Sequence, residues 1–351
     1  KAKSDIPVLY KQNVANDLFQ LIYVFDMGHN HDKALGTAFD YLEYLGTSDM
    51  TPEELKSEFY RLACTFYVSP GNERTYVVLS GLNENMPAAV QLFEKLLADA
   101  QVNKEAYTNM TSDILKARSD AKLNQGQNFS RLMSFAMYGP KSPATNLLTE
   151  AELTNMNPQE LVDRIHNQNS YKHRILYYGP SSSKDLLATI NQYHQVPAAL
   201  KDIPAGNEYS YLETPVTKVL VAPYDAKQIY MAQISNLDKK YDPAIEPIRA
   251  LYDEYFGGGM NSIVFQEMRE TRGLAYSAWA SIMPPSYLKY PYVLRTQIAT
   301  QNDKMIDAVT TFNDIINNMP ESEAAFKLAK DGLTNRLRTE RIIKGDIIWS
   351  Y

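Results

Sequence analysis

Cysteine is almost absent from this chain of 351 residues, which contains Cys64 alone. A single cysteine cannot form an internal disulfide, and it cannot supply the thiolate cluster of a structural zinc site. No apolar run approaches the ~20 residues that a membrane-spanning helix needs. Positive charge is not in excess either, because the net charge is -6 and the pI is about 5.5. This balance argues against a nucleic-acid-binding protein.

The remaining composition is that of an ordinary globular protein, with 44% hydrophobic and 22% charged residues. The length is sufficient for two domains with proper cores. The chain begins at Lys1 and stops within an apolar pattern, so we expect a piece of a longer protein, cut at both ends. The compartment therefore stays open between cytoplasm and periplasm, with a soluble protein expected in either.

Strand and helix patterns alternate along the first two hundred residues. Apolar alternation predicts strands at residues 7–13, 18–28, 66–72, 74–82 and 174–180. Helical periodicity and capping residues predict helices at residues 32–46, 51–63, 88–100, 104–123, 130–138, 148–168 and 184–195. The mixture indicates an α+β fold in which helices flank a mixed or antiparallel sheet.

A proline-containing stretch with little periodicity separates two parts of the chain. We expect a first domain at residues 1–200, a linker at 201–215 and a second domain at 216–351. The second domain opens with two further strand patterns, at residues 218–225 and 227–236.

The two domains resemble each other in sequence. Asn83, Met86 and Phe93 align without a gap on residues of the same type 219 positions later, the last of them Phe312. A repeat of this size indicates a duplicated α+β domain rather than a solenoid. The second copy ends before the final strand and helix of the first, so it is expected to be truncated.

Two short motifs have simpler interpretations than the functional ones they suggest. The glycines at 257–259 lack both the dinucleotide-binding spacing and the lysine of a phosphate loop, so a turn between helices is favoured. His29 and His31 would share a face of a strand and could bind zinc there. The neighbouring glycine and asparagine instead favour a turn with exposed histidines, and the other three histidines show no ligand spacing.

The stretch after the glycines changes its period from helix to strand. A helix is predicted at residues 262–271, with Gly273 suited to its C-terminal cap, and a strand at 274–281. Alternation along that strand places Tyr276 on the face opposite Trp279. Arg272 is expected to lie in solvent at the negative end of the helix dipole.

This segment, FGGGMNSIVFQEMRETRGLAYSAWAS, closely resembles a motif in the later domains of the pitrilysin/insulinase family of inverzincin zinc metallopeptidases. The group includes the mitochondrial processing peptidases. The resemblance implies repeated α+β domains with six-stranded sheets, and two halves that enclose a peptide-sized chamber. Arg269 and Tyr276, seven residues apart, match the arginine and tyrosine that bind substrate near the scissile bond in the family. A guanidinium and a phenol can both donate hydrogen bonds to a peptide oxyanion.

The first domain departs from the family at the zinc motif H-x-x-E-H. The corresponding positions start at Thr37 and end at Tyr41, so both histidines are missing, and Asp40 stands where the general base would be. Threonine and tyrosine make no zinc site, and no counterpart of the distal glutamate ligand is found. The first domain therefore resembles a metal-free copy, and zinc is expected only in the full-length enzyme.

Three functional hypotheses remain. The leading one is the C-terminal half of a zinc endopeptidase, inactive alone, which closes the chamber and binds peptide substrates with Arg269 and Tyr276. Its partner would then be an N-terminal catalytic half of the same polypeptide. The alternative is a non-catalytic subunit or scaffold that partners a separate catalytic chain. A weaker third hypothesis is a self-sufficient hydrolase that uses His29 and His31.

Overall fold

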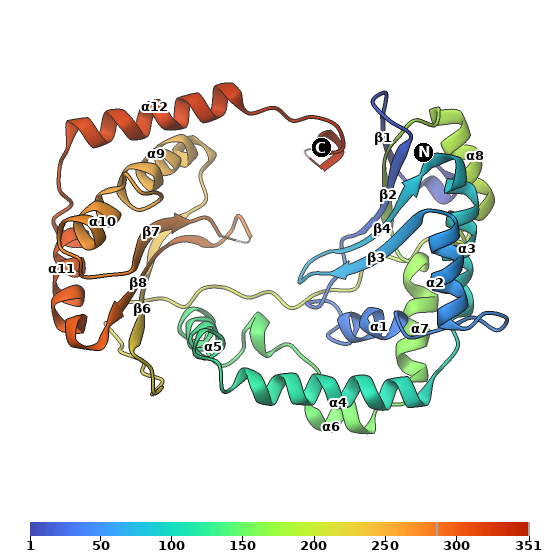
Figure 1. Cartoon of the computed structure of the whole chain (residues 1–351), viewed down its shortest axis with the longest axis horizontal. Coiled ribbons are helices and arrows are strands. Elements are labelled where there is room, and N and C mark those ends of the chain that lie inside the picture. Colours follow the sequence, from blue (N-terminus) through green and yellow to red (C-terminus); the bar gives the residue numbers. More distant parts are fainter. Residues whose placement is uncertain (286, 350–351) are drawn as a thin grey trace. The chain divides into compact units, whose positions relative to one another are not determined.

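Residues 1–285 and 287–349 are described by a computed structural model, in which the chain forms two units. Unit 1 comprises Lys1–Ser119, Thr145–Glu208 and the chain from Ile342 onward. Unit 2 comprises Asp120–Ala144 and Tyr209–Arg341. Each unit has a β-sheet with helices against it (Figure 1), which confirms the α+β class. The units are interleaved, because each contains a segment from the part of the sequence that forms most of the other.

Unit 1 contains a mixed five-stranded sheet. Its strands are β1 (Val8–Gln12), β2 (Leu18–Phe25), β3 (Cys64–Pro70), β4 (Thr75–Leu82) and β5 (His173–Gly179), in the order β1-β5-β2-β4-β3. Only β1 and β5 pair in parallel. Its helices are α1 (Leu35–Leu42), α2 (Pro52–Arg61), α3 (Met86–Asp99), α6 (Glu150–Asn155), α7 (Gln159–Asn167), α8 (Ser183–Tyr193) and α13 (Asp346–Trp349). The long helix α4 (Lys104–Ala121) begins in unit 1 and ends in unit 2.

Local sequence signals explain where several helices begin and end. Thr51 forms a capping box with Glu54 at the start of α2, which satisfies two backbone N–H groups that the helix leaves unpaired. The single helix predicted at residues 148–168 is wrong, because it is divided into α6 and α7. Pro158 stands between them, and a residue that precedes a proline avoids helical geometry.

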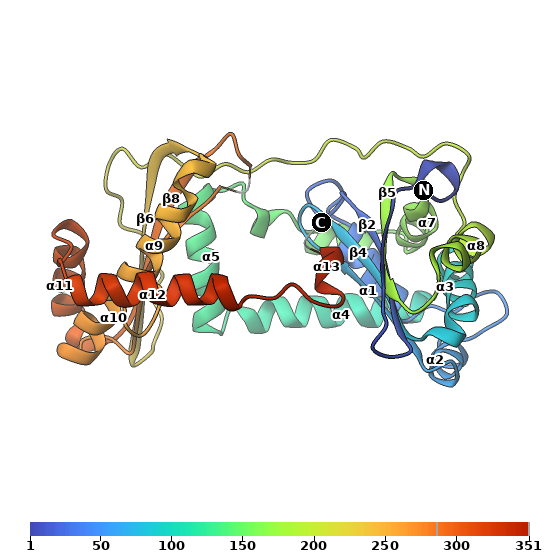
Figure 2. The same cartoon turned by 90° about the horizontal axis from the view of Figure 1, so that it is seen from above.

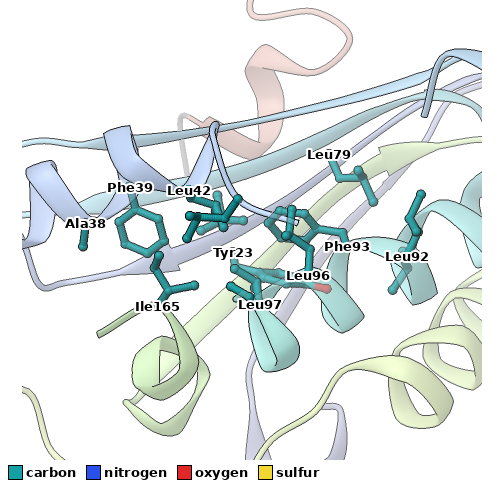
Figure 3. Close-up of a cluster of buried hydrophobic side chains, with 14 of the residues drawn as sticks. Tyr23, Ala38, Phe39, Leu42, Leu79, Leu92, Phe93, Leu96, Leu97 and Ile165 are labelled. Atoms are coloured by element: carbon teal, nitrogen blue, oxygen red, sulfur yellow. The ribbon is translucent and has the colours of Figure 1, made fainter. Parts of the chain in front are cut away.

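The main core of unit 1 lies between one face of its sheet and the helices α1, α3 and α7 (Figure 3). Tyr23 of β2 is 3% exposed and lies among side chains from all three helices, including Phe39, Phe93 and Ile165. Burying a side chain of this size contributes about 1.5–3 kcal/mol relative to leaving it in water. This core fixes the positions of α1 and α3.

The opposite face of the unit 1 sheet is covered by α13 (Figure 2). Ile348, 3% exposed, packs against a small apolar cluster that includes Val24 and Val78. Trp349 meets Tyr76 edge to face, with 5.3 Å between the ring centroids. A segment late in the sequence therefore completes a sheet built from the start of the chain.

Unit 2 repeats three of the five strands of the unit 1 sheet. Its strands are β6 (Gln228–Lys240), β7 (Ser277–Met283) and β8 (Pro291–Gln301), antiparallel in the order β6-β8-β7. Its helices are α5 (Gln125–Tyr138), α9 (Glu246–Phe256), α10 (Ile263–Phe265), α11 (Met305–Asn317) and α12 (Glu323–Thr339). The order β6-β8-β7 corresponds to β2-β4-β3, and α11 follows β8 as α3 follows β4. The duplication predicted from the sequence is thus visible in the fold.

Opposite faces of the unit 2 sheet have different neighbours. Ala278 and Ile298 lie in the core formed with α9, α10, α11 and α12. On the other face Phe129 of α5 contacts Tyr230 of β6, with 5.6 Å between ring centroids (Figure 2). Gly257 allows α9 to end directly on β7, because a Cβ at this position would lie 2.2 Å from the carbonyl oxygen of Ala280.

The strand predicted at residues 218–225 is wrong. This segment has no regular structure, and Val219 and Val221 are 82% and 76% exposed. Its apolar pattern resembles that of β1, which pairs with β5 in unit 1. Within the described part of unit 2 no strand corresponds to β5. A strand without a neighbour cannot pair its backbone groups, so the apolar pattern does not produce one here.

Candidate functional site

Arg269 lies in an unusual helical turn. The short helix α10 is followed by a π-helical turn over Gln266–Thr271 rather than by a regular helix. Such turns are rare and occur frequently at functional sites. Gly273 has φ +58 and donates its N–H to the carbonyl oxygen of Arg269 at 3.1 Å. The glycine therefore caps the turn, as the sequence predicts.

Tyr276 lies directly before β7. The strand begins at Ser277 rather than at Leu274, because the N–H groups of Leu274 and Ala275 both donate to the carbonyl oxygen of Met268 and extend the cap. The N–H of Tyr276 donates to Ala299 of β8 at 2.8 Å, which ties its backbone to the sheet. Its side chain is 71% exposed. A rigid sheet thus presents this phenol to solvent.

The structure brings Arg269 and Tyr276 together. The Arg269 Cζ atom lies 5.6 Å from the ring centroid of Tyr276 and 5.0 Å from that of Phe265. Both are cation–π distances, so the guanidinium is attracted to both rings. Its ion pair with Glu270 is long, at 3.5 Å, and both side chains are about half exposed. A solvent-exposed pair of this kind contributes little and leaves the arginine able to take another partner.

Arg272 has a different environment. It pairs with Glu267 at 3.3 Å, and half of its side chain is exposed. This agrees with the solvent position that the sequence suggests. Arg272 is therefore a suitable control position for substitutions of Arg269.

The duplicated unit 1 lacks the tyrosine. The registers of β3 with β4 and of β7 with β8 match, so the residue that takes the place of Tyr276 in unit 1 is Cys64. Cys64 is 2% exposed, and burial raises the pKa of its thiol. The exposed phenol is therefore a property of the second copy alone.

The positions that correspond to the zinc motif lie on α1 and serve the fold. Tyr41 is fully buried, and its hydroxyl donates to the carbonyl oxygen of Asn103 at 2.6 Å and accepts the N–H of the same residue at 2.9 Å. It thereby holds the start of α4. Thr37 is half-buried and is not a zinc-binding residue type. These residues do not fit a zinc ion, and across residues 1–285 and 287–349 no group of three or more His, Cys, Asp or Glu side chains is arranged to hold a metal.

Asp40 keeps a carboxylate at the position of the general base. Loss of hydration raises its pKa, the carboxylate of Glu43 raises it further, and His29 lowers it. A base of this kind acts on a metal-bound water in the family it resembles. The neighbouring positions cannot hold a metal, so they give Asp40 no metal-bound water to act on.

The two histidines near the start of the chain hold a turn. The Nδ1 atom of His31 accepts the N–H of Gly28 at 3.1 Å. The Nε2 atom of His29 lies 3.1 Å from the carbonyl oxygen of Pro70, so this nitrogen carries a proton. The predicted turn is confirmed, but the histidines are half-buried and engaged in local hydrogen bonds rather than exposed.

The sequence does not predict a hydrogen-bonded chain of three buried polar side chains in unit 1. His194 lies between Glu94 and His173, with its Nδ1 2.6 Å from the carboxylate and its Nε2 2.9 Å from the second ring. All three are buried. His173 donates from Nδ1 to the carbonyl oxygen of Tyr171, so its Nε2 accepts from His194. Burial, and secondly His194, lower the pKa of His173 to about 4.

Comparisons with known proteins relate this fold to peptidase domains. Residues 175–333 match the peptidase M16 inactive domain. The match covers less than half of the chain, and it confirms the resemblance to a metallopeptidase family that was stated from the sequence.

Proteins of known sequence or structure share part of this sequence or its fold. The chain is 20% identical over 263 residues to an uncharacterized zinc protease of Rickettsia felis, a match that covers 71% of this chain and 60% of the relative. The chain thus spans less than two thirds of that protein's length. The fold also matches the M16 inactive domain from Pseudomonas fluorescens, with a TM-score of 0.72 and 17% identity over 100% of this chain and 85% of that one.

A larger solved protein contains the same fold. The periplasmic protease PqqL of Escherichia coli matches 97% of this chain with a TM-score of 0.76 and 15% identity, but only 38% of its own chain is covered. Identities this low carry the fold alone. Among the helices of the described residues, none is long and apolar enough to cross a membrane.

Proposed function

We propose that this chain is the non-catalytic half of a zinc-dependent peptidase, and that it holds peptide substrates in an enclosed chamber. In this proposal Arg269 and Tyr276 donate hydrogen bonds to the substrate backbone. The zinc ion and the general base belong to an N-terminal catalytic half of the same protein. The chain alone is then inactive.

The adjacent and exposed pair of Arg269 and Tyr276 carries this proposal. A guanidinium has donors in a fixed planar fork, and a phenol has one rotatable donor, so the two together suit a carbonyl oxygen. Donors placed in advance stabilise charge that develops on such an oxygen during peptide cleavage. The buried Tyr41 and the half-buried Thr37 support the complementary part of the proposal, because they leave metal chemistry to another segment.

Substituting the pair in the complete protein tests its role. We expect Arg269→Ala to lower kcat/KM for peptide cleavage by about 100-fold, the usual cost of removing one donor from a developing oxyanion. Tyr276→Phe should lower it less, since it removes one hydroxyl and keeps the ring against the guanidinium. Arg272→Ala is the matched control and should leave kcat/KM unchanged. Equal turnover by the wild-type protein and the Arg269 variant would remove the proposed role.

A separate catalytic chain is the second candidate. Thr37 and Tyr41 cannot bind zinc, so the metal must be held elsewhere. A second polypeptide could hold it as well as another segment of the same one. In that case this protein is a non-catalytic subunit or scaffold. An H-x-x-E-H motif upstream in the same reading frame supports the first candidate. Copurification with a different polypeptide that carries the motif supports the second.

Zinc content distinguishes both candidates from a self-sufficient hydrolase. We expect the purified chain of residues 1–351 to hold far less than one zinc ion per molecule after dialysis against chelator-free buffer, measured by elemental analysis. The physical reason is that a stable site needs about four well-placed donors, at least three of them from the protein. One firmly bound zinc ion per chain would contradict the assignment of the metal to another segment.

A further inference from the structure

Arg295 occupies the centre of the unit 2 sheet, on the face that α9, α10, α11 and α12 do not cover. It belongs to the middle strand β8, where it lies opposite Ile234 of β6 and Ser281 of β7. Ile298, three positions further along β8, points into the core on the other face. A cation is therefore placed in the middle strand of the sheet, on the face where Phe129 of α5 contacts Tyr230.

The guanidinium of Arg295 contacts neighbouring side chains but forms no ion pair with a carboxylate of the described residues. Its Cζ atom lies 5.2 Å from the ring centroid of Trp279, and its Nη2 is 3.4 Å from the amide oxygen of Gln297. The Nε atom is buried and has no hydrogen-bond partner. Within the described parts of the chain no carboxylate lies within 4.0 Å of this side chain. Arg295 as a whole is half-buried, and a carboxylate is the acceptor that a guanidinium binds best.

The duplicated sheet of unit 1 provides an internal comparison. Tyr76 and Arg295 each lie six residues before the end of the corresponding strands β4 and β8. Gln297 likewise corresponds to Val78. In unit 1 the chain itself covers this place, because Ile348 packs on Val78 and Trp349 packs on Tyr76. This position is thus apolar in unit 1, where a short segment of the chain covers it. In unit 2 the same position is cationic.

We propose that Arg295, Trp279 and Gln297 form a carboxylate-binding subsite on the face of the unit 2 sheet opposite its core. Its occupant is an Asp or Glu side chain of a bound peptide. The carboxylate accepts from the two terminal nitrogens of Arg295, in the two-bond geometry that suits a guanidinium. The indole of Trp279 supports the plane of the arginine and covers the apolar part of the peptide side chain. The inference rests on the proposed function and adds a preference for acidic peptides to it.

The chain has two tryptophans, one of which lies in the proposed subsite. A Trp349→Phe variant of the whole chain therefore reports on Trp279 alone by its fluorescence. Two short peptides, blocked at both ends and identical except for one Glu or Gln, are titrated into this variant. We expect the Glu peptide to change the emission of Trp279 and to bind about tenfold more tightly than the Gln peptide, as a charge-assisted pair implies. Added salt should reduce the difference.

Substitution of the arginine then tests the site itself. Arg295→Gln should abolish the preference by weakening only the Glu peptide, and Arg295→Lys should keep part of it, because the charge remains but the planar fork is lost. Arg272→Gln is the control, and it should preserve the ratio of the two affinities. Equal binding of the two peptides to the parent variant, no binding of either, or an unchanged ratio after Arg295→Gln would each overturn the subsite.

A further variant separates this inference from the proposed function. Arg269→Ala should weaken both peptides equally, because it removes a contact to the backbone rather than to the side chain. If Arg269→Ala has no effect while the preference still depends on Arg295, the role given to Arg269 fails and the carboxylate subsite stands. If Arg269→Ala weakens both peptides and Arg295→Gln changes nothing, the reverse holds.

Discussion

The Phe93→Ala variant is expected to lose about 3–5 kcal/mol from the free energy of unfolding of unit 1, the cost of truncating a fully buried phenylalanine. Phe93 is 1% exposed and lies between α3 and the sheet (Figure 3). Its ring contacts that of Phe66, with 4.8 Å between centroids. Removing it forfeits the transfer free energy of the ring and leaves a cavity that the surrounding helices cannot fully close.

The duplication supplies a matched variant for this experiment. Phe312 of α11 occupies the corresponding position of unit 2 and is fully buried. Hydrogen exchange of peptides from α3 and α11 reports the two units separately. Phe93→Ala should accelerate exchange in α3, and Phe312→Ala should do so in α11. Equal acceleration in both helices for either variant would show that the units unfold as one, and would contradict the expectation of two separate cores.

Acidification from pH 6.5 to about 4 is expected to destabilise unit 1 by about 3 kcal/mol through His173 alone. The pKa of this ring is lowered from 6.5 to about 4, chiefly by burial. Between these values the unfolded chain binds a proton at His173 and the folded chain does not. The free energy of unfolding therefore falls as the pH falls across this window. Above pH 6.5 both states are neutral at this ring, and its contribution no longer changes.

The pH slope, rather than the stability at one pH, measures this effect. Denaturant unfolding at several pH values should show a loss of about 1.4 kcal/mol per pH unit within the window. His173→Phe, which fits beside the ring of Phe25 at this site, should remove that slope even if it lowers stability throughout by leaving His194 without its acceptor. A slope that persists undiminished in the variant would assign the acid sensitivity to other groups.

Much of the fold follows from local pattern. The capped helix at Thr51, the strands around Tyr23 and Val77, and the repeat that aligns Phe93 with Phe312 all depend on periodicity and capping that are present in the sequence itself. The predictions that fail depend on contacts between distant parts of the chain. An apolar pattern at residues 218–225 predicts a strand, but strand formation also requires a neighbour, and a single segment contains no information about one.

The candidate site was only partly predictable for the same reason. Arg269 and Tyr276 are seven residues apart, so one motif contains both. Arg295 and Trp279 meet only through the register of β7 with β8, and Glu94 meets His194 from a hundred residues away. Neither spacing matches a known motif. An arginine in an alternating strand, where an apolar residue would suit a covered face, was the one available signal for the subsite.

The interleaving of the two units has a consequence for synthesis on the ribosome. Domains generally fold from the N-terminus as they emerge. The apolar cluster around Val24 and Val78, however, is covered by Ile348, which is translated after all of the residues that form unit 2. Part of the unit 1 sheet therefore stays uncovered while Tyr209–Arg341, more than a hundred residues, are translated. Transiently exposed apolar surface favours aggregation, so this interval is the vulnerable one for unit 1.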